Sequence, residues 1–334
     1  MPESSDRKAP VAKGHIPLGS FAFIVLQLAL LTIAIRQFRI ESPAFLRLAI
    51  LAFGGFVIHT FLPLKWRLLF FVGLSFAAIF VVLGIATGAW VIGLGLVLIG
   101  ICHLPMRLRY RAGLLVGVGI LLAVQRAGLI GSPWSQAVWP ILGSMFMFRL
   151  IVYLYDLEHE TVPPSPSRTL GYFFLLPNVC FPLFPVVDYK AFRRNYYDDE
   201  AVRIYQIGVD WMARGVIHLI LYRVVYYYFV VAPAEVHDVR TFTQFVVANF
   251  LLYLRVSGQF HMIVGMLYLF GFRLPETHHK YFLSSSFTDF WRRINIYWKD
   301  FMLKIFYYPL YFKLKSFGPT RALVISMNQA HSVS

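Results

Sequence analysis

The chain has 334 residues, of which 58% are hydrophobic and only 14% are charged, whereas a soluble domain carries roughly 25% charged residues. No Asp or Glu occurs between Glu41 and Asp156, so this region cannot form the surface of a soluble globule and is expected to lie in a membrane. The net charge of +15 comes from basic residues at the ends of apolar runs, which argues against nucleic acid as a partner and favours a lipid bilayer.

The first half of the chain predicts a basic tail and six spans. Residues 1–18 are polar and basic, and the apolar run after them lacks the small-residue cleavage site of a signal peptide. Runs long enough to cross about 30 Å of hydrocarbon follow at 19–35, 44–63, 68–86, 88–104, 113–131 and 135–155. More Lys and Arg fall on the side of the N-terminus than on the opposite side, which favours a cytoplasmic N-terminus.

The second half is more polar and its apolar runs are interrupted. The expected segments are a loop at 156–168, a broken or re-entrant helix at 169–187, a surface helix at 188–210, and spans at 211–232, 241–257 and 260–272. The sequence therefore predicts an all-α, polytopic transmembrane protein with about nine spans plus re-entrant and interfacial helices. One membrane domain, 19–326, is expected to precede a polar tail, 327–334.

Neither the cysteines nor the adjacent histidines form a pattern typical of a metal site. Cys102 and Cys180 lie in apolar sequence and are expected to be buried core residues without a disulfide. His278 and His279 follow a Pro-Glu turn and are interpreted as loop residues, because two adjacent side chains supply too few converging ligands. We therefore expect no metal site.

One polar stretch, Ser284–Tyr311, stands out in this apolar chain. Its charged and amide side chains, which lie among aromatic residues, are Asp289, Arg292, Arg293, Asn295, Lys299, Asp300 and Lys304. Polar residues are costly in a membrane protein and are often functional, so this stretch is the first candidate for a site.

Three ordered segments resemble a known family. Ser257-Gly-Gln-Phe-His-Met-Ile-Val-Gly265 is followed by Phe270-Gly-Phe-Arg-Leu-Pro-Glu276 and, after Tyr281, by Ser285-Ser-Phe-Thr-Asp-Phe-Trp-Arg-Arg293. This order resembles the membrane-bound O-acyltransferase (MBOAT) family, in the bacterial branch that includes alginate O-acetyltransferase and the teichoic-acid D-alanyl transfer protein. The matching stretch covers 257–311.

The resemblance implies an integral, multi-pass protein of the bacterial inner (cytoplasmic) membrane that transfers an acyl group to a hydroxyl. The donor would be a thioester, either acyl-CoA or an acyl-carrier protein, and no bound cofactor is implied. The acceptor would be a hydroxyl of a glycan, a lipid or another exported molecule, with companion export or modification proteins as implied partners. This chemistry requires a base for the hydroxyl proton and donors that stabilise the developing oxyanion.

Asn295 stands where alginate-type members carry a histidine after Phe-Trp-Arg-Arg, whereas other branches carry asparagine. An amide cannot accept a proton at neutral pH, so the expected role of Asn295 in catalysis is a hydrogen bond to the substrate or the oxyanion. The alternative is that Asn295 only ties helices together.

The resemblance also implies substrate-binding residues at Trp291, Arg292, Arg293 and Asp289. Either arginine is expected to hold a phosphate of the donor or its carrier through a bidentate contact. The alternative is contact with lipid headgroups, because later lysines continue a basic, amphipathic pattern. Asp289 is expected to be an internal partner of one of the arginines.

The general base is harder to place. The family carries a histidine on a hydrophobic helix after the Phe-Trp-Arg-Arg helix, but here the chain turns polar after Ser326, and the only later histidine is His331. We therefore expect a truncated member of the family, with His331 or His261 as the remaining candidates for the base. A lone histidine in an apolar helix, such as His261, also has a packing interpretation.

Two alternatives from other classes remain. A truncated acyltransferase without activity would act as a membrane scaffold. A transporter would carry paired broken helices or charged residues inside several spans. Charged residues are scarce in the first six expected spans, which disfavours transport.

Overall fold

The structure is a computed structural model that describes residues 16–136, 138–159, 165–181 and 187–314. These residues form helices and no strand, and Tyr196 and Phe272 make an isolated antiparallel bridge. The prediction of an all-α protein is therefore confirmed. His331 and the tail 327–334 lie outside the described residues.

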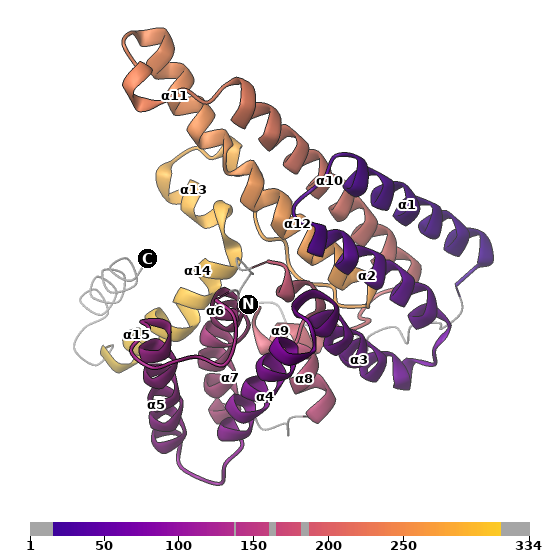
Figure 1. The fold of residues 1–334 in the computed structure, drawn as a ribbon, viewed down its shortest axis with the longest axis vertical. Helices are drawn as coiled ribbons and strands as arrows, with labels where there is room; N and C mark the ends of the chain where they lie inside the picture. The colour runs from indigo at the N-terminus through magenta and orange to yellow at the C-terminus, as the bar shows by residue number, and fades with distance from the viewer. Residues whose placement is uncertain (1–15, 137, 160–164, 182–186, 315–334) are drawn as a thin grey trace, which may run out of the picture.

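The first half consists of long apolar helices that match the six expected spans within a few residues (Figure 1). They are α1 (Leu18–Gln37), α2 (Pro43–Phe61), α3 (Leu64–Leu83), α4 (Ile85–Cys102), α5 (Leu108–Arg126), and the continuous run of α6 (Val138–Leu142), the π-helix η1 (Gly143–Met147) and α7 (Phe148–His159). With Val239–Leu269, seven segments of the described chain are long and apolar enough to cross a membrane. The expectation of about nine spans is not confirmed.

The second half is built from shorter pieces around one long helix. In order these are α8 (Pro166–Phe173), η2 (Leu176–Val179), α9 (Tyr189–Arg194), α10 (Ala201–Tyr228), η3 (Pro233–Glu235), α11 (Val239–Leu251), α12 (Leu254–Leu269), η4 (Tyr281–Leu283), α13 (Phe287–Ile294), α14 (Ile296–Met302), the π-helix η5 (Leu303–Tyr307) and α15 (Tyr308–Leu314). The predicted pair 241–257 and 260–272 is a single apolar segment with a break at Leu252 and Tyr253.

The prediction of one surface helix at 188–210 is wrong. Helix α9 ends at Arg194, and α10 begins at Ala201 and continues through most of the predicted span 211–232. Tyr197 has a φ of +50°, a left-handed conformation that a helix does not accommodate, so the chain turns between the two helices.

Helices α10 and α12 pack side by side at the centre of the second half (Figure 1). A Cβ atom on Gly208 would lie 2.8 Å from the carbonyl oxygen of Gly265, and one on Gly215 would lie 2.9 Å from that of Gly258. Because the pairs run in opposite directions along the chain, the helices are antiparallel. Small residues let membrane helices approach this closely, and nearly all of α12 is buried as a result.

Arg149 is a fully buried charge at the middle of the α6–α7 run. Its guanidinium donates to the carbonyl oxygens of Tyr172 and Phe173 at 3.0 and 3.1 Å, and to the side chain of Asn178. Helix α8 ends at Phe173, where carbonyl groups have no partner within the helix. Arg149 therefore stabilises the chain where α8 ends, within the broken or re-entrant helix that the sequence predicts at 169–187. The structure describes this segment at 169–181 and at 187.

The two cysteines differ in burial. Cys102 is buried at the end of α4, as predicted, whereas Cys180 is only partly buried against the core.

Candidate functional site

The hydroxyl of Ser257, a fully buried residue of α12, lies between two imidazole rings. Ser257 Oγ is 2.7 Å from His218 Nδ1 and 2.9 Å from His278 Nε2. A hydroxyl donates only one proton, so when it donates to one ring, the other ring must donate to it. The protonation of His218 and that of His278 are therefore coupled through Ser257.

A third imidazole, His261, lies against both of these rings. Its ring centroid is 4.9 Å from that of His218 and 4.6 Å from that of His278. His261 makes no hydrogen bond to any described residue, and its Nδ1 atom is buried. We call His218, His261, His278 and Ser257 the imidazole cluster.

The imidazole cluster is not arranged as a metal site. Within the described ranges, no group of three or more His, Cys, Asp or Glu residues has the geometry to hold a metal ion. A neutral imidazole can accept and release a proton near physiological pH, so proton transfer is a reaction that these side chains can perform.

Glycine contacts explain how α10 and α12 bring these residues together. Ser257 precedes Gly258, which meets Gly215, and His218 lies one turn after Gly215 on the same helix. A larger residue at either glycine would separate the helices and lengthen the bond between His218 and Ser257.

The loop after α12 carries His278 back to the helices. Gly271 begins this loop with a φ of +86°, and a Cβ atom there would lie 2.2 Å from the ring of Tyr197. The amide of Tyr197 in turn donates to the carbonyl oxygen of Gly271 at 2.8 Å. A close backbone approach that only glycine permits therefore joins this loop to the α9–α10 turn.

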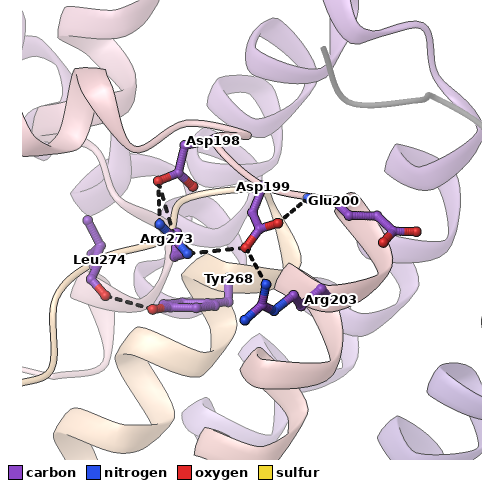
Figure 2. Close-up of polar contacts among 7 residues, drawn as sticks. All are labelled: Asp198, Asp199, Glu200, Arg203, Tyr268, Arg273 and Leu274. Carbon is purple, nitrogen blue, oxygen red and sulfur yellow. Dashed lines mark hydrogen bonds and ion pairs between the residues drawn. The ribbon is translucent and has the colours of Figure 1, made fainter. Parts of the chain in front are cut away.

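Arg273 fixes the same loop by ion pairs (Figure 2). Its guanidinium lies 2.9 Å from Asp198 Oδ2 and 3.2 Å from Asp199 Oδ2. Beside it, the Tyr268 hydroxyl donates to the carbonyl oxygen of Leu274 at 2.7 Å, which ties the loop to α12 (Figure 2). The ion pairs of Arg273 and the hydrogen bond from Tyr268 hold residues 271–274 in place. They thereby fix the position of His278, four residues further along the loop.

The Phe-Trp-Arg-Arg segment adjoins the imidazole cluster through its backbone. The amide of His279 donates to the carbonyl oxygen of Arg293 at 3.0 Å, and the amide of Ile296 donates to that of Thr277 at 2.9 Å. The Tyr253 hydroxyl also donates to the carbonyl oxygen of Ile294 at 2.7 Å. The structure therefore brings two parts of the motif region, 257–278 and 293–296, into one place.

Asn295 lies within this junction and caps a helix. Its Oδ1 atom accepts a hydrogen bond from the amide of Trp298 at 3.0 Å, at the N-terminus of α14. This contact has a structural role within α14, and the amide nitrogen of the side chain has no partner among the described residues.

Asp289 pairs with both arginines of α13, so the expectation of an internal partner is confirmed. Asp289 Oδ1 lies 2.6 Å from Arg292 and Oδ2 lies 2.8 Å from Arg293. Burial raises the pKa of Asp289, but hydrogen bonds from Arg293 and Arg292 outweigh it and hold the pKa below its ordinary value. The side chain of Arg292 remains 68% exposed and that of Trp291 is half exposed.

Sequence reasoning placed His261 among the candidates and missed its neighbours. His278 does lie in a loop, as predicted, but it is buried in the cluster, whereas His279 is exposed and pairs with Glu276 at 2.9 Å. His218 lies 39 residues before Ser257 and was not considered. The sequence feature that could have identified His218 as a candidate is the one that identified His261, since each is a lone histidine in an apolar helix.

A cavity of about 370 Å³ lies close to the imidazole cluster. It is lined by Asn195, Ile207, Trp211, Tyr268 and residues 273–276. Trp211 lines the cavity, and its ring also lies against His261, with 4.6 Å between the ring centroids. A cavity of this size accommodates a small-molecule ligand.

The pH dependence of stability reports on the burial of His278. Burial, with a smaller effect of His218, lowers the pKa of His278 to about 4, whereas an unfolded histidine has a pKa of about 6.5. Between these values the unfolded state binds more protons, so the contribution of His278 to stability is complete above about pH 6.5 and falls as the pH approaches about 4.

We expect the unfolding temperature in nanodiscs to fall over this pH window. The fall should be smaller in the His278→Asn variant. An identical pH dependence in the variant would contradict this assignment.

No protein-family model matches the chain, and no curated protein is significantly similar to it.

Proposed function

We propose that this chain is a membrane-bound O-acyltransferase that moves an acyl group from a thioester donor, acyl-CoA or an acyl-carrier protein, to a hydroxyl of a glycan, a lipid or another exported molecule. The observation that carries the proposal is the imidazole cluster, which lies beside the Phe-Trp-Arg-Arg-Ile-Asn segment in a mostly apolar helical protein. The cytoplasmic membrane of a bacterium is the proposed location.

His261 is the proposed general base. It is the imidazole of the cluster with no hydrogen bond to a described residue, so its ring keeps an unshared lone pair that can accept a proton. His261 takes the hydroxyl proton while the hydroxyl oxygen attacks the thioester carbonyl; the tetrahedral intermediate then expels the thiolate, which recovers the proton from the imidazolium. His218, Ser257 and His278 position the ring.

The donor is proposed to approach from the side of α13. Arg292 and Arg293 share one carboxylate, Asp289, so this group keeps a net positive charge. The exposed guanidinium of Arg292 is free on its outer side to hold a phosphate of the donor. Trp291, which is half exposed, supplies apolar contact beside it.

The Asn295→Asp variant separates the two roles of Asn295. The aspartate keeps an oxygen that accepts from Trp298, so the unfolding temperature should stay close to that of the wild type. It removes the amide donor, so an oxyanion role predicts a loss of about 10²–10³-fold in thioester turnover. Release of free thiol from acetyl-CoA by the protein in nanodiscs measures turnover.

The control for this experiment is Asn295→Ala, which removes both groups and should also lose about 0.5–2 kcal/mol of stability. Wild-type turnover in Asn295→Asp would remove Asn295 from the mechanism. If the wild-type protein itself does not turn over any thioester, the proposed activity is wrong.

A membrane scaffold without catalysis is the second candidate. The bonds of Ser257 to His218 and His278 and the capping contact of Asn295 favour it, because hydrogen bonds of this kind also occur in a purely structural network. In that case substitutions in the cluster would change stability alone.

A further inference from the structure

A groove of about 760 Å³ lies at the turn between α4 and α5, at one end of the helical bundle (Figure 1). Residues 104–109 line it together with Arg111 and Glu158. We call it the arginine groove, because three of its side chains are arginines and one is acidic. It lies outside the imidazole cluster and the α13 segment, and the proposed function does not use it.

The charges of the arginine groove are unbalanced. Arg111 is matched, since it donates to the carbonyl oxygen of Cys102 at 2.9 Å and lies 3.6 Å from Glu158. Among the described residues, the guanidinium of Arg109 has a hydrogen bond and a cation–π contact with the neutral Tyr110 alone. Arg107 has neither a hydrogen bond nor an ion pair with the side chain of any described residue. Two exposed guanidinium groups therefore lack an acidic partner in the part of the chain that the structure describes.

The start of α5 adds to this positive field. This helix has 19 residues, and its N-cap residue, Arg107, supplies no side-chain acceptor for the first amides. Free amide groups at a helix N-terminus point toward an approaching ligand, and the helix dipole favours a negative charge there. The backbone and the side chains thus favour the same kind of ligand.

We propose that the arginine groove binds the phosphate group of an anionic ligand. A guanidinium offers paired donors that match phosphate oxygens, which distinguishes phosphate from a diffuse negative charge. Leu104 and Met106 are 37% and 39% exposed at the same turn, so apolar surface adjoins the charged groups. The phosphate comes from a phospholipid headgroup or from a soluble phosphorylated compound. This proposal holds whether or not the chain is an acyltransferase.

Two probes distinguish these sources. The first is phosphatidylglycerol in mixed nanodiscs, with the lipid retained on the released protein counted by native mass spectrometry. The second is adenosine 3′,5′-bisphosphate, titrated calorimetrically against the protein in nanodiscs of phosphatidylcholine alone. Each experiment compares the wild type with the double variant Arg107→Gln/Arg109→Gln.

The matched control is Arg36→Gln/Arg126→Gln, which removes two exposed arginines at the C-terminal ends of α1 and α5. Each arginine near an anionic group contributes about a fivefold change in affinity, so the groove variant should bind its ligand roughly 25-fold more weakly than the control.

Weaker retention of phosphatidylglycerol in the groove variant identifies the lipid headgroup as the ligand. Weaker binding of the bisphosphate identifies a soluble phosphate compound. If the groove variant and the control bind both probes equally, the proposal is wrong. Unfolding temperatures of the two double variants, measured in the same nanodiscs, show whether the fold is retained in each.

Discussion

If the proposed acyl transfer uses His261 as its base, replacing His261 with alanine is expected to lower the rate by about 10²–10⁴-fold, the usual contribution of a general base. The ring of His261 is buried against Trp211, and it is not hydrogen-bonded to the described residues, so its loss removes a proton acceptor without breaking a hydrogen bond. Free thiol released from acetyl-CoA by the protein in nanodiscs gives the rate.

His279→Ala is the control for this prediction. His279 belongs to the same region, but its exposed side chain pairs with Glu276 alone among the described residues, so its loss should change the rate less than about threefold. A further comparison, Ser257→Ala, removes the hydroxyl between His218 and His278 and keeps His261. It should lower the rate less than His261→Ala does, because it disturbs only the positioning of the base. Equal rates in His261→Ala and His279→Ala would exclude His261 as the base.

The second large effect is expected at the contact of α10 and α12. In Gly265→Ala the new methyl group would lie 2.6 Å from the carbonyl oxygen of Gly208, and backbone atoms cannot rotate away as a side chain does. The helices must therefore separate, at a cost of about 1–3 kcal/mol. The unfolding temperature in nanodiscs measures this cost. Because His218 and Ser257 lie along the same contact, thioester turnover should fall as well.

Gly93→Ala in α4 makes the same chemical change where a Cβ atom would meet nothing within 4 Å. Alanine is a better helix former than glycine, so this variant should be as stable as the wild type or more stable, by up to about 1 kcal/mol. Equal losses in Gly93→Ala and Gly265→Ala would show that the close helix contact does not contribute to stability.

Hydropathy predicted the first half of the fold well because each span there is a separate apolar run bounded by polar residues. α1 begins and ends within two residues of the predicted 19–35. The method failed for α10, because the charged residues of 188–210 predicted one surface helix before the span, namely Lys190, Arg193, Arg194, Asp198, Asp199 and Glu200. The helix is continuous because its buried side packs on α12. The charged and apolar residues of one segment do not show which other helix will pack against it.

The candidate site was predicted only in part for a similar reason. The matching stretch, 257–311, includes Ser257, His261 and His278 of the imidazole cluster, and the pairing of Asp289 with an arginine follows from their spacing on one helix. The approach of His218 to Ser257 depends on which helices are neighbours, and that of His278 depends on the turn at Gly271. Neither follows from local sequence. The role of Asn295 in catalysis stays a prediction.

The partners of Arg149 bear on how the chain enters the membrane. A charged residue at the centre of a spanning helix raises its insertion free energy by about 2.5–3.5 kcal/mol. The carbonyl groups that accept from Arg149 belong to residues 23 and 24 positions later, so Arg149 leaves the ribosome ahead of its acceptors. We therefore expect residues 138–159 to become fully stable in lipid only together with α8, which supplies the acceptors.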